Sequence, residues 1–262
     1  MKKIFYPAIF LILFIVISAV VYFLFFTPLE KAGFLAGFIG KKEPLQEPPL
    51  VGWEIAAEEE FIEFSEIFKN NQLGLETLTK AKENSAKLKQ DSNNYDLYIE
   101  AGIYWKVLGD LLVPTFQKEK AEIFYQKAIK IYEKAIEISQ GKAWVPYLNL
   151  GNVSRAVKDY SQAETAYRKA LELSPGEGML WSTLAEFYRY DLKKIPEEVK
   201  NVYKEGLKVV VINANLLQEY ADYLRDIGQL KEALEIFQQL YEKYPTAYLK
   251  EEIERIKIEL EK

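Results

Sequence analysis

Residues 147–175, YLNLGNVSRAVKDYSQAETAYRKALELSP, decide the fold of this chain. Small and aromatic residues recur three or four positions apart, first around Gly151 and again after Ala163. In each half, these residues therefore lie on one face of a helix. Between the halves, Lys158-Asp159 is expected to form the turn. Pro175 lacks an N–H group and ends the second helix. The stretch therefore predicts a helical hairpin whose apolar faces need neighbours.

Copies of the same spacing flank this hairpin on both sides. Downstream, Ala185 lies 34 residues after Gly151 and belongs to the first helix of the next copy. A further copy occupies residues 217–245, and an earlier one begins near residue 98 with a turn expected at Gly109-Asp110. Three repeats are about the minimum for a stable stack, so four copies predict a self-supporting one.

The pattern resembles the tetratricopeptide repeat (TPR), a unit of two antiparallel helices. This resemblance implies an all-α fold, a right-handed α-solenoid of stacked helix-turn-helix repeats. We interpret residues 53–92 as an N-terminal helical pair, either a cap or a degenerate repeat, and residues 248–262 as a C-terminal capping helix. The four TPR-like repeats within residues 93–247 are placed at about 95–142, 144–177, 178–213 and 214–247.

Two copies depart from the pattern. In the first, the second-helix alanine, Ala128, follows Gly102 by 26 residues, which is 14 more than in the central hairpin. This surplus predicts a second helix over residues 114–139, lengthened by about four turns, with the proline in its first turn. In the third copy, a longer loop is expected at residues 191–196.

A long apolar run precedes the repeats. Residues 4–26, which begin with Ile4 and end with Phe26, number 23 and carry no charge. Such a run is long enough to cross a bilayer core of about 30 Å, and no small-x-small cleavage motif follows it closely. The sequence therefore predicts residues 1–30 as a short cytoplasmic stub with an uncleaved transmembrane signal anchor. Residues 31–52 are expected to be a juxtamembrane segment and a proline-rich linker.

The lysines around this run indicate its orientation. Lys2 and Lys3 precede it, Lys31 follows closely, and Lys41 and Lys42 lie farther away. Because positive charge near the span favours the cytoplasmic side, the N-terminus is expected inside and the repeats outside the cytoplasm.

Composition excludes several kinds of site. The 262 residues include no histidine and no cysteine, which removes serine–histidine and cysteine–histidine nucleophiles and the usual zinc ligands. No glycine-rich phosphate loop is present. A formal net charge of −5 disfavours nucleic acid as a partner. We therefore expect no catalytic residue, no cofactor and no metal; a carboxylate-based enzyme on a helical solenoid is a minor alternative.

The resemblance also implies where a partner binds, because stacked TPR repeats present a concave groove lined by their first helices. Transferred to this sequence, the groove is apolar toward the first repeat and polar toward the last, with one cation per repeat. The predicted groove residues are Ile99, Ile103, Lys106, Leu148, Asn152, Arg155, Glu186, Arg189, Asp222 and Arg225.

A row of cations could hold an acidic or extended peptide, since guanidinium groups bind carboxylates bidentately. The alternative is pairing within a helix, because Glu186 and Asp222 each lie three residues before an arginine. Lys106 and Arg155 show no such neighbour in this interpretation and are the better candidates.

These observations predict a membrane-anchored, non-catalytic TPR scaffold that binds a protein or peptide partner through its groove. The alternative is a structural subunit of a membrane complex that self-associates through the membrane helix or through the lengthened helix of residues 114–139.

Overall fold

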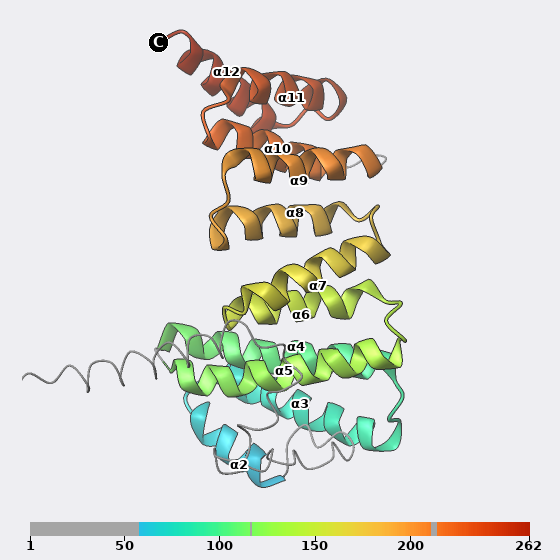
Figure 1. The fold of residues 1–262 in the computed structure, drawn as a ribbon. Helices are drawn as coiled ribbons and strands as arrows, with labels where there is room; N and C mark the ends of the chain where they lie inside the picture. Colours follow the sequence, from blue (N-terminus) through green and yellow to red (C-terminus); the bar gives the residue numbers. More distant parts are fainter. Residues whose placement is uncertain (1–57, 116, 211–213) are drawn as a thin grey trace, which may run out of the picture. The chain divides into compact units, whose positions relative to one another are not determined.

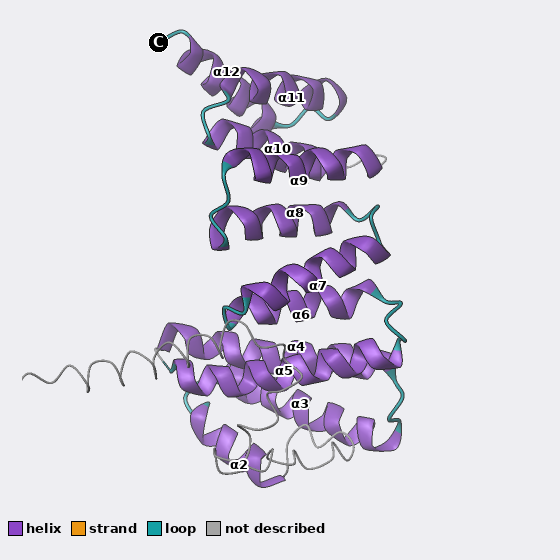
Figure 2. Cartoon of the chain, in the orientation of Figure 1, coloured by secondary structure: helices purple, strands orange, loops and turns teal. Residues whose placement is uncertain are grey.

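The computed structural model describes residues 58–115, 117–210 and 214–262. In these ranges the chain consists of helices and the turns between them (Figures 1 and 2). The predicted transmembrane run and the linker lie outside the described residues. Among the helices that are described, none combines the length and the apolar character needed to cross a membrane.

The helices follow one another in antiparallel pairs (Figure 1). In chain order they are α2 (Glu58–Ile67), α3 (Gln72–Gln90), α4 (Tyr95–Leu112), α5 (Lys118–Ile138), α6 (Trp144–Ala156), α7 (Tyr160–Leu173), α8 (Gly178–Glu186), α9 (Pro196–Val209), α10 (Ala214–Asp226), α11 (Leu230–Lys243) and α12 (Ala247–Leu260).

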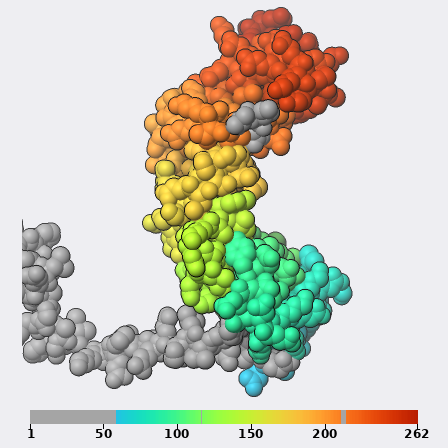
Figure 3. Space-filling model, turned by 90° about the vertical axis from the view of Figure 1, so that its right-hand side faces the viewer, coloured from blue at the N-terminus to red at the C-terminus, as the bar shows by residue number. Residues whose placement is uncertain are grey.

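Each of the helices from α2 to α11 packs on the helix that follows it. Side chains fill the spaces that the ribbon leaves between successive pairs (Figure 3). The prediction of an all-α solenoid of TPR-like repeats is confirmed for the described part of the chain.

Small residues let paired helices approach closely, as the sequence pattern predicted. A Cβ atom at Gly151 on α6 would lie 2.5 Å from Cε1 of Tyr167 on α7, so the tyrosine ring occupies the space that glycine leaves. In the third repeat the second helix carries the glycine instead: Gly206 on α9 faces Trp181 on α8. The exchange keeps the same close contact with the aromatic residue on the opposite helix.

The predicted turn of the central hairpin is confirmed. Lys158 has a φ of +64°, and Asp159 caps α7 by accepting a hydrogen bond of 3.0 Å from the backbone N–H of Gln162. Helix α7 ends at Leu173, two residues before Pro175.

The predicted turn at Gly109-Asp110 is wrong. Helix α4 continues to Leu112, and Gly109 is buried inside it, where its missing side chain makes room for the ring of Tyr125. Helices α4 and α5 have 18 and 21 residues, whereas α6 and α7 have 13 and 14. The insertion therefore lengthens both helices of the first repeat and not the second alone.

Pro114 also lies elsewhere than predicted. It belongs to a short 3-10 turn, η2 (Val113–Thr115), and α5 begins at Lys118. The apolar face of α4 extends through Leu108 and Leu112, both buried, and this face keeps the helix intact up to the proline.

In the third repeat, α8 continues into a π-helical turn, η3 (Phe187–Asp191). The backbone N–H of Leu192 donates to the carbonyl of Phe187 over 3.1 Å, five residues back. The connection to α9, residues 192–195, is longer than residues 157–159, which join α6 and α7 in the central hairpin. A longer connection was predicted, but Asp191 belongs to the helical turn. A π turn inserts an extra residue into a helix and re-aims the side chains after it.

The N-terminal end is held by an aromatic cluster, the stacking aromatics. Phe64 on α2 packs edge-on against Trp105 on α4 and Phe124 on α5, with ring centroids 5.8 and 4.8 Å apart. Phe61 and Phe68 complete the cluster. Phe61 and Phe64 of α2, with Phe68 directly after it, form one aromatic face that joins α2 to the first repeat.

At the other end, α12 packs on α11 through its apolar face. Leu249, Ile253 and Ile256 are buried and Lys250 is exposed, so the helix is amphipathic. Leu260, in the last turn of the helix, is 41% exposed.

The buried residues form two clusters that divide between α6 and α7. One runs from Phe61 to Val153 and includes Ala166; the other runs from Ala163 to Ile256. The central hairpin therefore contributes to both cores.

Candidate binding face of the first helices

The ten predicted groove residues lie on α4, α6, α8 with η3, and α10. We call this surface the first-helix face. Helix α4 contacts α6, and α8 contacts α10, so the residues occur on neighbouring helices of the stack. The predicted positions therefore follow one another along the stack. What each side chain can bind depends on its contacts within the protein.

The apolar part of the face is partly used for packing. Ile99 on α4 and Leu148 on α6 are half-buried and pack against the two cores. Ile103 is 44% exposed. Of these three side chains, Ile103 offers the most apolar surface to a partner.

Lys106 is engaged within its own helix. Its Nζ lies 2.6 Å from Oδ2 of Asp110, one turn further along α4, and Oδ1 of Asp110 accepts a hydrogen bond of 2.8 Å from the hydroxyl of Tyr125. The prediction that Lys106 has no neighbouring partner is wrong. It failed because Asp110 was assigned to a turn, although it continues the helix.

Arg155 is engaged with the next repeat. Its Nε lies 2.7 Å from Oδ2 of Asp191 in η3, and the two side chains are 29% and 18% exposed. The two residues are 36 positions apart, so the helical spacing used for the prediction could not reveal the pair. The partner of Arg155 therefore lies in the next repeat and not within its own helix.

Arg189 repeats this arrangement one repeat later. Its Nη2 lies 2.9 Å from Oδ2 of Asp226 at the end of α10. The guanidinium also sits over the rings of Tyr190 and Tyr223, 4.8 and 5.1 Å from their centroids. The predicted pair with Glu186 is replaced by this contact between repeats.

Arg225 makes the densest set of contacts. Its Nη1 lies 2.5 Å from Oδ1 of Asp222, as predicted for an i,i+3 pair, and 2.7 Å from Oε2 of Glu252 on α12. Its Nη2 lies 2.9 Å from Oδ1 of Asp226. Glu252, whose side chain is 9% exposed, also pairs with Arg255.

We call the contacts Arg155–Asp191, Arg189–Asp226 and Arg225–Glu252 the inter-repeat arginine pairs. Burial alone would raise the pKa of Asp226, but hydrogen bonds from two arginines outweigh it and hold the pKa below its ordinary value. Burial lowers the pKa of Arg225, yet its hydrogen bonds to Asp226, Tyr248 and Glu252 raise it overall. The cations of this face are therefore compensated by the protein's own carboxylates.

Asn152 is fixed by the second helix of its own repeat. Its Oδ1 accepts a hydrogen bond of 2.9 Å from the hydroxyl of Tyr167. Burial raises the pKa of Tyr167 to about 12, and the opposing effect of Arg155 does not cancel this rise. The tyrosine therefore stays a donor at neutral pH, and the NH₂ group of Asn152 is left as the donor that can face a ligand.

The α8–α10 part of the face is acidic. Burial raises the pKa of Glu219, a hydrogen bond with Ser182 opposes it, and the charges of Glu186 and Asp222 raise it further. Glu219 was not among the predicted groove residues, because it lies three residues before Asp222 and outside the positions transferred from the TPR pattern.

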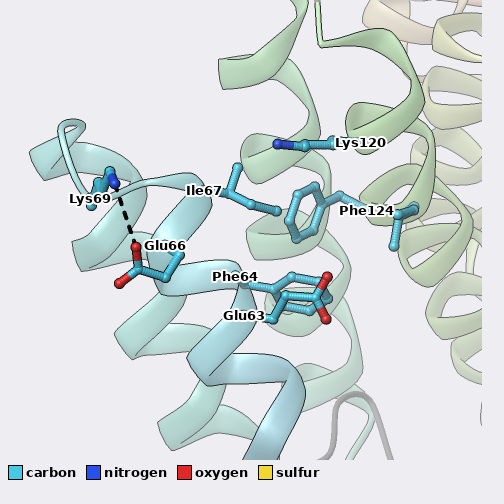
Figure 4. A pocket seen from close by; sticks show the side chains of 8 residues that line it. Glu63, Phe64, Glu66, Ile67, Lys69, Lys120 and Phe124 are labelled. Atoms are coloured by element: carbon cyan, nitrogen blue, oxygen red, sulfur yellow. Dashed lines mark ion pairs between the residues drawn. The ribbon is translucent and has the colours of Figure 1, made fainter.

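Two shallow pockets lie on either side of α2, away from the first-helix face. One, of about 350 Å³, lies between α2 and α5 and is shown in Figure 4; the other, of about 270 Å³, lies between α2 and α3. The larger pocket is lined by Glu63, Phe64, Glu66, Ile67, Lys69, Lys120, Ile123 and Phe124. The sequence did not reveal these pockets, because they depend on where α2 docks. In the described ranges, no group of acidic side chains is arranged to hold a metal ion.

Two family models of tetratricopeptide repeats match the chain, at residues 104–134 and 145–177. The first match covers parts of α4 and α5, and the second covers most of α6 and all of α7. The chain contains tetratricopeptide repeats. These TPR matches include the hairpin from which the fold was predicted.

Solved TPR structures are similar at low sequence identity. A thermophilic TPR protein of Thermus thermophilus is 15% identical, with a TM-score of 0.48 over 77% of this chain and 100% of that one. MamA 41-end from Desulfovibrio magneticus RS-1 is 15% identical, with a TM-score of 0.47 over 70% and 93% of the two chains.

A third structure, YrrB, a TPR protein with an unusual peptide-binding site, is 19% identical, with a TM-score of 0.41 over 69% and 85% of the two chains. A comparison with curated protein sequences finds no match. The TPR assignment rests on the family models and on the helix packing.

Proposed function

We propose that this protein is a membrane-anchored TPR scaffold that binds a protein or peptide partner and catalyses no reaction. The membrane part of the proposal is supported by the 23 uncharged residues from Ile4 to Phe26, a length that suits a transmembrane helix. The non-catalytic part is supported by the lack of histidine and cysteine, which removes the commonest nucleophiles and proton carriers.

The partner site is placed on the α4–α6 part of the first-helix face. The observation that carries this choice is the contrast along the face: Ile103 is exposed on α4, whereas the arginines are tied to carboxylates. An acidic peptide would have to displace those carboxylates. A partner with an apolar side chain for Ile103 and a carbonyl for the Asn152 amide needs no such exchange.

Proximity crosslinking tests this site. A photoreactive residue replaces Leu148, beside Asn152 on α6, in the full chain in its native membrane. We expect a discrete partner to be captured, and we expect I103E to reduce the capture because a carboxylate opposes apolar contact. The matched control is I258E on α12, where an isoleucine is also exposed.

Equal loss with I258E, or capture that is unchanged by I103E, would place the partner elsewhere. Repeating the experiment with R155Q tests whether the partner binds the apolar surface at Ile103 or the cation at Arg155. If the cation binds the partner, R155Q weakens capture as much as I103E does.

The orientation is proposed as well: N-terminus in the cytoplasm and repeats outside it, following the lysines that flank the apolar run. Because the chain has no cysteine, S161C introduces a single thiol at an exposed position at the start of α7. A membrane-impermeant maleimide should label it in intact cells. If labelling requires cell lysis, the repeats lie in the cytoplasm and the proposed orientation is wrong.

A further inference from the structure

We propose that the pocket between α2 and α5 is a self-association surface, where two copies of this chain meet in a two-fold symmetric contact. This inference does not rest on the proposed partner site, because the pocket and the first-helix face use different residues.

The pocket has an apolar floor and open edges (Figure 4). Phe64 and Phe124 form the floor, and Ile67 points toward the ring of Phe124. Ile123 belongs to the lining and is 48% exposed. Apolar surface gathered around a depression is a common mark of an interaction site.

The charges on the two walls are the decisive feature. Glu63 on α2 and Lys120 on α5 both line the pocket and are exposed. Neither has an ion-pair partner within the described residues, whereas Glu66 and Lys69 on the same wall pair with each other over 3.6 Å. The pocket thus carries one uncompensated charge of each sign, on opposite walls.

This combination fits a second copy of the same chain. In a two-fold contact, if residue i of one copy touches residue j of its partner, then j touches i as well. Glu63 of each copy can then face Lys120 of the other, so the contact contains two identical ion pairs. A partner of a single charge sign would match one wall and oppose the other.

Charge reversal provides the test. The full chain, with S161C carrying a donor or an acceptor dye, is reconstituted in lipid vesicles, and energy transfer is followed as the protein is diluted in lipid. E63K alone and K120E alone each place two like-charged pairs in the contact, so we expect each to weaken association at least about tenfold.

The two single variants should recover association when they are mixed. In the mixed pair, the lysine introduced by E63K meets the glutamate introduced by K120E, while Lys120 of the first copy meets Glu63 of the second. The double variant E63K/K120E should likewise associate as the original does. I123S should weaken association, whereas I258S, at an exposed isoleucine on α12, should not.

Either of two results would overturn the inference. If the original chain shows no concentration-dependent energy transfer, the pocket does not bind a second copy. If the original chain associates but the mixture of single variants does not recover, the two copies meet through a different surface. Circular dichroism of each variant confirms that the helices are intact.

Discussion

The two ends of the stack differ in the contacts that dominate between their helices, although Lys127 of α5 also pairs with Glu60 of α2 at the N-terminal end. At the N-terminal end, the stacking aromatics join α2 to the first repeat through buried rings such as Trp105 and Phe124. From the central repeat onward, the inter-repeat arginine pairs add charged contacts to the apolar core. The same type of repeat is therefore held by two kinds of contact, aromatic and charged. The two kinds should respond differently to mutation, salt and pH.

The largest expected effect is on the aromatic end. Trp105 is fully buried, so W105A should destabilise the protein by about 3–5 kcal/mol, the usual cost of removing a large buried aromatic side chain. Denaturant unfolding measures the loss, and hydrogen exchange should locate it in α2 to α5. The control is Y190A, an exposed aromatic in η3, for which we expect less than about 1 kcal/mol. Equal losses would contradict the contrast between the two ends.

The next effect tests the close approach in the central hairpin. A Cβ atom at Gly151 would lie 2.5 Å from the ring of Tyr167, and that ring is buried and hydrogen-bonded to Asn152. We expect G151A to cost about 1–3 kcal/mol through overpacking. G176A is the matched control, because no atom lies within 4 Å of the position that a Cβ would occupy there. A neutral G151A would mean that the ring can move aside freely.

An effect of similar size is expected where α12 contacts α10. R225A removes a cation that contacts Glu252, whose carboxylate is mostly buried, and we expect a cost of about 1–3 kcal/mol. R255A removes the exposed cation from the same carboxylate and should cost less than about 1 kcal/mol. Thermal unfolding of the two variants gives the order. The reverse order would show that the α12 contact does not depend on Arg225.

The smallest effect is a pH dependence in the charged half. Hydrogen bonds from Arg189 and Arg225 hold the pKa of Asp226 below its ordinary value despite its burial. A carboxylate with a depressed folded-state pKa contributes stability above its unfolded pKa of about 4 and loses it as pH falls through the folded value. Asp226 is about a third exposed, so this contribution should be under about 1 kcal/mol.

The measurement is the unfolding free energy of the original chain and of D226N between pH 6 and pH 3. The stability difference between the two proteins should stay constant down to about pH 4 and shrink below it. D159N provides a control at an exposed aspartate in the central turn. A difference that vanishes well above pH 4 would contradict a lowered pKa.

The sequence predicted the helix pairs because their signals are local. Ala163 and Tyr167 lie one turn apart on α7, and the ring of Tyr167 fills the space that Gly151 leaves on α6. The error at Gly109 has a physical cause, since glycine serves both as a helix terminator and as a site of close packing. Only the position of Tyr125 shows which role applies.

The candidate site was less predictable because its contacts join different repeats. Asp191 and Asp226 reach the arginines only once the hairpins are stacked, and η3 changes the direction of Asp191 in a way that no spacing rule anticipates. The Asp222–Arg225 pair was predicted because both residues share one helix. The pocket beside α2 could not be derived at all, since α2 and α5 are far apart in the chain.

The inter-repeat arginine pairs also bear on how fast a partner reaches the first-helix face. Exposed, uncompensated cations draw acidic ligands from a distance and accelerate the encounter, an effect that salt suppresses. In this protein, neighbouring carboxylates pair with the guanidinium groups and neutralise their charges. An acidic partner gains no steering from these arginines, so it should reach the first-helix face at about 10⁵–10⁶ M⁻¹s⁻¹, the range of encounters without electrostatic steering.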